Sequence, residues 1–125
     1  MSKNIPYSLK YFTFSEDKSF ILESGEKFGP ITVGYETFGE LNEKKDNAIL
    51  VIHALTGDSH VTSGYDPDKT TPGWWDALIG IGKSIDTRRH FVICANYFGG
   101  CMGSTGPSSI NPDTGKPYGL KFPIF

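Results

Sequence analysis

The residues best suited to chemistry form a short polar stretch directly after an apolar run. Residues 48–52 read A-I-L-V-I, and residues 53–58 follow as H-A-L-T-G-D. Gly57 lets the backbone turn sharply. A backbone N–H held at such a turn can stabilise the negative charge that develops on a carbonyl oxygen during acyl transfer. An ordinary turn that ends a strand has the same pattern, so the residue types alone leave both interpretations open.

Two further patterns hold reactive residue types. His53, Asp58 and His60 could ligate a metal, but catalytic zinc needs three protein ligands in a defined spacing. We therefore predict no metal site and expect His53 to hydrogen-bond to the backbone. Cys101 is the centre of G-G-C-M-G, which imitates a nucleophile elbow. An elbow must lead into a helix, and residues 104–109 form helices poorly, so we expect a structural loop there.

Residues 77–84, A-L-I-G-I-G-K-S, match a loose phosphate-binding loop. That mechanism needs a strand before the loop and a helix after it, so that backbone N–H groups converge on phosphate. Here a predicted helix precedes the loop and a strand follows it. The order is reversed, and nucleotide binding is not predicted.

The elements that must position these residues are mostly strands. Residues 10–14, 19–23 and 31–38 predict short strands joined by tight turns, which favours antiparallel pairing. Residues 48–52 and 90–96 are continuously apolar, which is typical of strands buried on both faces in a parallel sheet. After Asn96 the sequence predicts no regular structure.

A helix is predicted between the two buried strands. Thr71 and Pro72 form a helix start, and residues 74–79 supply the helix, with Trp74 and Trp75 packed against the sheet. Residues 58–71 read as a long surface loop of the kind that often carries function. A strand, a helix and a parallel strand make the predicted class α/β.

Composition excludes several classes of protein. The chain has 125 residues, 12 Lys+Arg and 14 Asp+Glu, and a net charge of −2. A nucleic-acid binder would carry a concentrated basic surface. No run reaches the ~18 apolar residues of a membrane span. The two cysteines form no disulfide scaffold, and we expect a cytoplasmic protein.

Taken together, the motifs resemble homoserine O-acetyltransferase, a family of the α/β-hydrolase superfamily that acts in methionine biosynthesis. The resemblance extends from about Phe20 to Phe125. Its most specific parts are residues 53–58, 72–76, 82–83, 85–87, 91–96, 99–107 and 109–119.

The resemblance implies an incomplete α/β-hydrolase sheet, in which antiparallel leading strands precede a parallel strand–helix–strand unit. Residues 1–125 would form the N-terminal portion of a single domain that stops before the nucleophile elbow. No G-x-S-x-G occurs in the sequence. We therefore assign no nucleophile, acid or base, and His53, His60 and His90 are not assigned as the general base.

The resemblance also implies roles for individual residues. The backbone N–H of Leu55 would complete the oxyanion hole. The substrate-binding residues would be Thr56, Gly57, Asp58, Asn96, Gly99 and Gly100. The substrates would be acetyl-CoA and L-homoserine, with no bound cofactor and no metal, and complete relatives would be homodimers.

Other functions stay open at this point. Within the same family, the donor could be succinyl-CoA or the acceptor could be serine. An esterase of the α/β-hydrolase superfamily would share the same opening strands. A non-catalytic binding module that uses residues 58–71 is the alternative from another class.

Overall fold

The computed structural model describes residues 9–64, 71–100 and 102–125. Within them the chain forms strands β1 to β8 and one short 3-10 helix, η1. The described residues divide into two compact units. The first unit contains residues 9–10 and 35–95, and the second contains residues 11–34 and 96–125.

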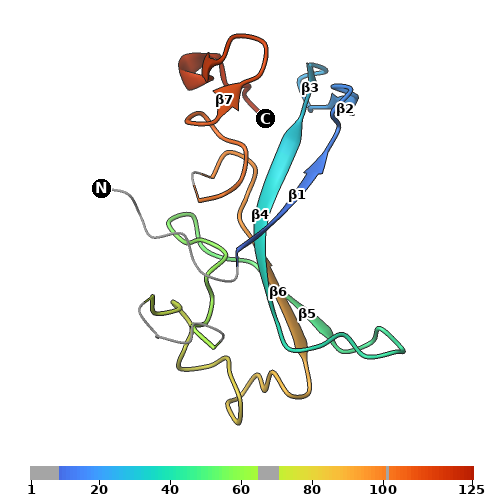
Figure 1. Cartoon of the computed structure of the whole chain (residues 1–125), viewed down its shortest axis with the longest axis vertical. Helices are drawn as coiled ribbons and strands as arrows, with labels where there is room; N and C mark the ends of the chain where they lie inside the picture. Colours follow the sequence, from blue (N-terminus) through green and yellow to red (C-terminus); the bar gives the residue numbers. More distant parts are fainter. Residues whose placement is uncertain (1–8, 65–70, 101) are drawn as a thin grey trace. The chain divides into compact units, whose positions relative to one another are not determined.

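The main sheet has the strand order β1-β4-β6-β5 (Figure 1). β1 is Lys10–Phe14, β4 is Ile31–Phe38, β5 is Ala48–Val51 and β6 is Phe91–Ala95. β4 pairs antiparallel with β6, and β5 pairs parallel with β6. Parallel neighbours require a crossover connection, which residues 52–90 supply. The predicted parallel pairing is therefore confirmed.

The helix predicted over residues 74–79 is wrong, because turns occupy this segment. The N–H groups of Trp74 and Trp75 donate to the carbonyls of His60 and Val61, at 3.2 and 2.8 Å. A single helical turn is costly to nucleate, and within the segment there are only turn bonds, such as those from the N–H groups of Leu78 and Ile79 to the Trp75 carbonyl. The two indoles are 40% and 42% exposed, so they are not the buried sheet contacts that we expected.

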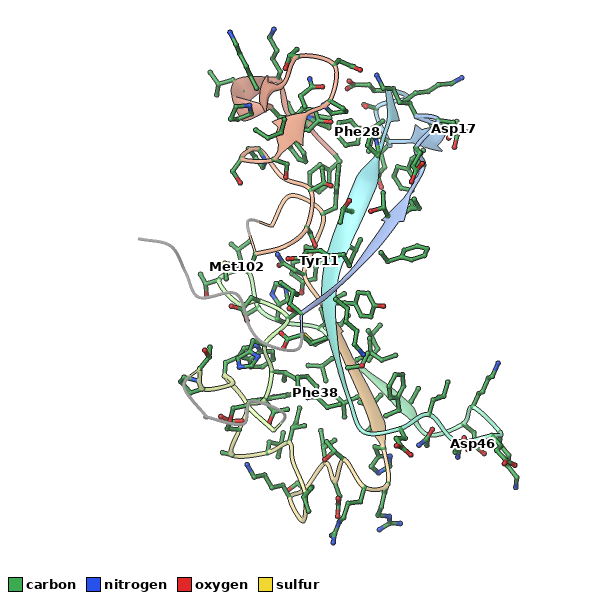
Figure 2. All side chains as sticks on the ribbon, in the orientation of Figure 1. Tyr11, Asp17, Phe28, Phe38, Asp46 and Met102 are labelled. Carbon is green, nitrogen blue, oxygen red and sulfur yellow. The ribbon has the colours of Figure 1, made fainter. Side chains whose placement is uncertain are left out.

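Each unit has its own hydrophobic core. In the first unit the buried side chains of the core are Phe38, Val51, Val61, Ile79, Val92 and Cys94. In the second unit they are Leu22, Phe28, Ile31 and Tyr118. Figure 2 labels Phe38 and Phe28, one from each core. Burying one such large apolar side chain stabilises the fold by about 1.5–3 kcal/mol.

The prediction that residues 48–52 are buried on both faces is wrong. Leu50 and Ile52 are 63% and 65% exposed, whereas Val51 belongs to the first core. β5 lies at the end of the strand order. Residues two positions apart lie on the same face of an extended strand, so among the described residues the face with Leu50 has no apolar cover.

The second unit adds short elements that sequence reasoning placed incompletely. β2 (Phe20–Ile21) pairs antiparallel with β3 (Lys27–Phe28), within the strand predicted over residues 19–23 and the turn after it. β7 (Ile110–Asn111) pairs with β8 (Lys116–Pro117), and η1 spans Gly119–Lys121. Regular structure after Asn96 was not predicted. Among the helices of the described residues, none has the length and apolar character to cross a membrane.

Candidate functional site

The polar stretch after β5 forms a tight turn. The Gly57 N–H donates to the carbonyl of Ala54 at 2.8 Å, which closes a turn over residues 54–57. A Cβ on Gly57 would lie 3.1 Å from the Cβ of His53, closer than most side chains tolerate. The glycine thus allows the turn to fold back tightly on the end of the strand.

Leu55 lies at the tip of this turn. Its side chain is 95% exposed, although leucine is usually buried. Among the described residues, none provides a hydrogen-bond acceptor for the Leu55 N–H. An N–H that the described residues leave without an acceptor is open to a substrate oxygen. An oxyanion donor has to be open in this way.

The side chain of His53 is hydrogen-bonded to the backbone of the turn. Its ring is buried, at 4% exposure, and its Nδ1 donates to the carbonyl of Ala54 at 2.7 Å. The expected backbone hydrogen bond of His53 is therefore confirmed. The contact adds a second attachment to Ala54, the first residue of the turn.

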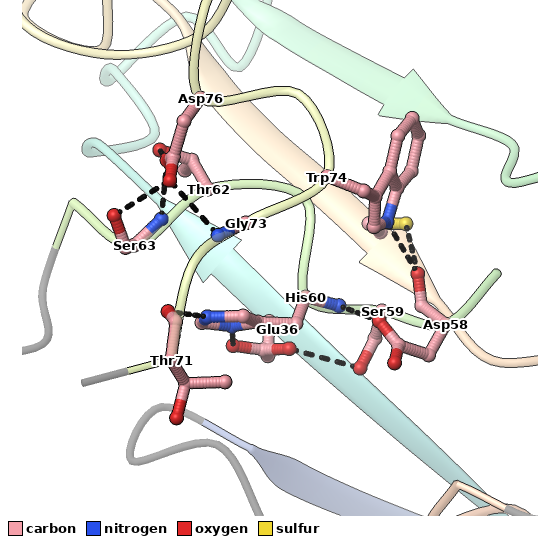
Figure 3. A network of polar contacts seen from close by, with 11 residues as sticks. Glu36, Asp58, Ser59, His60, Thr62, Ser63, Thr71, Gly73, Trp74 and Asp76 are labelled. Atoms are coloured by element: carbon pink, nitrogen blue, oxygen red, sulfur yellow. Dashed lines mark hydrogen bonds and ion pairs between the residues drawn. The ribbon is translucent and has the colours of Figure 1, made fainter. Parts of the chain in front are cut away.

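Asp58 fixes the other end of the turn (Figure 3). Its carbonyl accepts hydrogen bonds from Trp74 Nε1 at 3.0 Å and from Cys94 Sγ at 3.7 Å. Its carboxylate accepts from the His60 N–H at 2.9 Å. Burial, with the nearby acidic side chains of Glu36 and Asp58, raises the pKa of Cys94 to about 12. The thiol therefore stays protonated and serves as a donor.

A buried ion pair lies beside Asp58. Glu36, on β4, is 0% exposed and its Oε1 lies 2.8 Å from Nδ1 of His60. Its second oxygen accepts from the hydroxyl of Ser59 at 3.0 Å. The hydrogen bond to Glu36 raises the pKa of His60 to about 9, against the opposing effect of burial.

Sequence reasoning missed this pair, although β4 carries a signal for it. The buried residues of β4 include Gly34, Glu36 and Phe38, which alternate along one face of the strand. A carboxylate on this buried face of the strand needs a buried partner, because an unpaired buried charge is very costly.

A second carboxylate ties the crossover together. Asp76 accepts hydrogen bonds from the hydroxyls of Thr62 and Ser63 and from the N–H groups of Ser63 and Gly73, at 2.7–2.9 Å. Burial opposes the charge, but these bonds outweigh it and lower the pKa of Asp76 to about 2. The carboxylate thus replaces the missing helix as the organiser of this segment.

The first unit also contains a pocket of about 320 Å³. Its lining includes Phe38, Thr62, Asp76 and Lys83, and it includes none of the predicted site residues. The Nζ of Lys83 donates to the carbonyl of Asp76. The polar groups at this pocket are thus largely engaged with each other.

The predicted substrate-binding residues fall in both units. Thr56, Gly57 and Asp58 lie with Leu55 in the first unit, and Asn96, Gly99 and Gly100 lie in the second.

In the second unit, Gly100 packs closely on the Asn96 side chain, since a Cβ there would lie 2.6 Å from its Oδ1. Gly99 has φ of 89°, which favours glycine, and its N–H donates to Thr105 O at 2.8 Å. These residues form a compact loop at the end of β6.

The other reactive patterns have structural roles where they are described. In residues 77–84 the Gly80 N–H donates to Ile85 O at 3.1 Å, and the segment does not run from a strand into a helix. No cluster of three metal-ligand side chains occurs in residues 9–64, 71–100 and 102–125. Cys101 and residues 65–70 of the predicted functional loop lie outside the described residues.

Comparison with known proteins gives specific similarities, although no family model matches the chain. The homoserine O-acetyltransferase of Deferribacter desulfuricans is 60% identical over 116 residues, which are 93% of this chain and 30% of that protein. The chain spans between 23% and 30% of the length of the curated relatives compared.

Solved structures give the same result. The homoserine O-acetyltransferase of Bacillus anthracis is 39% identical, with a TM-score of 0.82, over 94% of this chain and 32% of that one. Esterase E22 is 41% identical, with a TM-score of 0.80, over 93% of this chain and 32% of that one. The resemblance to homoserine O-acetyltransferase and the α/β-hydrolase fold class are thereby confirmed.

Proposed function

We propose that this chain is the N-terminal part of a homoserine O-acetyltransferase, which transfers acetyl from acetyl-CoA to the hydroxyl of L-homoserine. The observation that carries the proposal is the 60% identity to such an enzyme over 93% of this chain. The exposed turn supports it, because the Leu55 N–H has no acceptor among the described residues and acyl transfer needs a fixed donor for the developing oxyanion.

The proposed reaction has two steps. A serine hydroxyl, deprotonated by a histidine, attacks the thioester carbonyl of acetyl-CoA. The C–S bond breaks, the protonated histidine gives its proton to the leaving CoA sulfur, and an acetyl-serine remains. The hydroxyl of homoserine then attacks the acetyl-serine carbonyl and loses its proton to the histidine, which returns it to the serine. The products are CoA and O-acetylhomoserine.

This chain would contribute binding and charge stabilisation to both steps. The Leu55 N–H would donate to the oxyanion of each tetrahedral intermediate. Thr56, Gly57 and Asp58 would form the adjacent wall, and the loop with Asn96, Gly99 and Gly100 would contribute to substrate binding. The serine, histidine and acid would come from residues outside this sequence.

A second candidate is an esterase, favoured by the 41% identity to esterase E22. Both functions use the same acyl-serine, and they differ in whether water or an amino-acid hydroxyl accepts the acyl group. The similarities to homoserine O-acetyltransferases reach 60%, which favours the transferase.

The test is to measure CoA release by the complete enzyme with and without homoserine. A transferase releases CoA in proportion to homoserine, with O-acetylhomoserine as the product by mass spectrometry. Succinyl-CoA and serine serve as the alternative donor and acceptor. Release of acetate that homoserine does not accelerate would identify an esterase and refute the proposal.

A further inference from the structure

The turn with Leu55 is connected directly to a buried charge on the sheet. Residues 58–60 follow the turn at once, and two of them contact Glu36 of β4. The Ser59 hydroxyl donates to Oε2 of Glu36 at 3.0 Å, and His60 Nδ1 lies 2.8 Å from Oε1. Glu36, Ser59 and His60 are all at least 95% buried.

Both ring nitrogens of His60 face acceptors. Nδ1 lies against the Glu36 carboxylate, and Nε2 lies 2.8 Å from the carbonyl of Thr71. Since a carbonyl can only accept, and a carboxylate accepts as well, both nitrogens carry protons. His60 is thus a fixed cation that joins β4 to the segment before Pro72, and it has no nitrogen left for proton transfer.

Asp58, the last residue of the polar stretch over residues 53–58, is held by contacts that include the backbone of His60. The Asp58 carboxylate accepts from the His60 N–H, and its carbonyl accepts from Trp74 and Cys94. At the other end, Ala54 is held by His53 and Gly57. Leu55 and Thr56 therefore lie between two anchored residues. Figure 3 shows the contact by which His60 anchors Asp58.

We propose that Glu36 and His60 are positioning residues for acyl transfer, which hold the turn over residues 54–57 so that the Leu55 N–H keeps its direction as the oxyanion forms. This inference rests on the proposed function. A donor must be oriented before charge develops, and a misplacement of about 1 Å can cost about 100-fold in rate.

The choice of a buried ion pair supports a role in orientation. Replacing such a pair by well-packed apolar residues is often neutral or stabilising, so stability alone does not require Glu36 and His60 here. Two charged groups with several directed hydrogen bonds do define one geometry for the attached segment. The pair fixes the positions of Ser59 and His60, which an apolar contact would leave freer to rotate.

The experiment uses the complete enzyme with Glu36→Gln, His60→Gln, the double variant and Ile79→Ala as a control. Ile79 is fully buried in the first core, so its truncation lowers stability, and its side chain does not belong to the Glu36–His60 network. Single-turnover CoA release gives the acylation rate, steady-state kinetics give KM for homoserine, and thermal unfolding gives Tm. Amide hydrogen exchange of Gly57, whose N–H closes the turn on the Ala54 carbonyl, reports the order of the turn without reference to activity.

We expect each single variant to slow acylation about 10- to 100-fold, with KM for homoserine within twofold of wild type and faster exchange at Gly57. Ile79→Ala should lower Tm at least as much and keep acylation within about threefold. The double variant should lose less than the product of the single losses, because the two residues act as one unit.

Acylation within threefold of wild type in Glu36→Gln and His60→Gln, with only Tm lowered, would overturn the inference. If the wild-type enzyme transfers no acetyl group, the proposed function fails by itself. Hydrogen exchange then still decides the positioning role, since unchanged exchange at Gly57 in Glu36→Gln refutes it and faster exchange there supports it.

Discussion

Replacing Leu55 by proline should remove the proposed oxyanion donor without disturbing the turn. Leu55 is the second residue of the turn closed by the Gly57 N–H and the Ala54 carbonyl. Proline is favoured at this position of common β-turns, and it has no N–H. The hydrogen bond that closes the turn does not involve the Leu55 nitrogen, so it is retained.

The expected loss follows from the charge that the donor stabilises. Removing one oxyanion donor costs about 100- to 1,000-fold in kcat, or about 2.7–4 kcal/mol. The Leu55 side chain is 95% exposed, so its replacement removes almost no buried contact. Proline at a compatible turn position stabilises a protein by about 0.4–1 kcal/mol through the unfolded chain. Activity should therefore fall while Tm stays level or rises.

The assay is homoserine-dependent CoA release by the complete enzyme, compared for wild type, Leu55→Pro and the control Leu55→Ala. The alanine variant keeps the N–H and should retain kcat within about threefold, because only an exposed side chain is shortened. If Leu55→Pro kept more than a third of the wild-type kcat with a normal Tm, Leu55 would not be an oxyanion donor.

Three further predictions concern ionisation. The pKa of His60 is raised from 6.5 to about 9, so its contribution to stability is complete below pH 6.5 and is lost as pH rises through 9. The midpoints of urea unfolding should fall across this pH range in wild type and much less in His60→Gln. The pKa of Asp76 is lowered from 3.8 to about 2, so its contribution to stability is lost as pH falls through this range. Asp76→Asn should lower Tm at pH 7 and flatten the dependence of Tm on pH between pH 4 and 2. Cys94, with its pKa raised to about 12, should resist iodoacetamide at pH 8 until the protein unfolds; in a Cys101→Ser background, labelling of folded Cys94 at the rate of an exposed thiol would contradict this.

Strands were the part of the fold that the sequence predicted best. The alternating residues 31–38 form β4 over that full range, and the two apolar runs form parallel neighbours with bounds within one residue of prediction. Alternation and apolar runs are local signals that the chain itself carries. The exposure of Leu50 could not be predicted from the local sequence, because it depends on what covers one face of the sheet.

The failure of the helix prediction has a different cause. Residues 74–79 have a proper start signal, but the N–H groups of Trp74 and Trp75 bond to residues 60 and 61. The carboxylate of Asp76 collects four hydrogen bonds from Thr62, Ser63 and Gly73. These partners lie 3 to 14 positions from Asp76 in sequence, so no local periodicity could reveal them. Tertiary contacts here outweigh a helix propensity that is small for so short a segment.

In the candidate site, too, local contacts could be predicted from the sequence and long-range contacts could not. The turn at Gly57 and the backbone contact of His53 could be predicted, because both form within a few residues. The contact between Glu36 and His60 joins residues that are 24 positions apart. The sequence indicates only Glu36, through its position on the buried face of β4. An acid on the buried face of a strand needs a buried donor, and Ser59 and His60 both supply one to Glu36. Such an acid, when it binds the residues that directly follow a turn with a proposed backbone donor, is a candidate positioning residue even where no catalytic motif includes it.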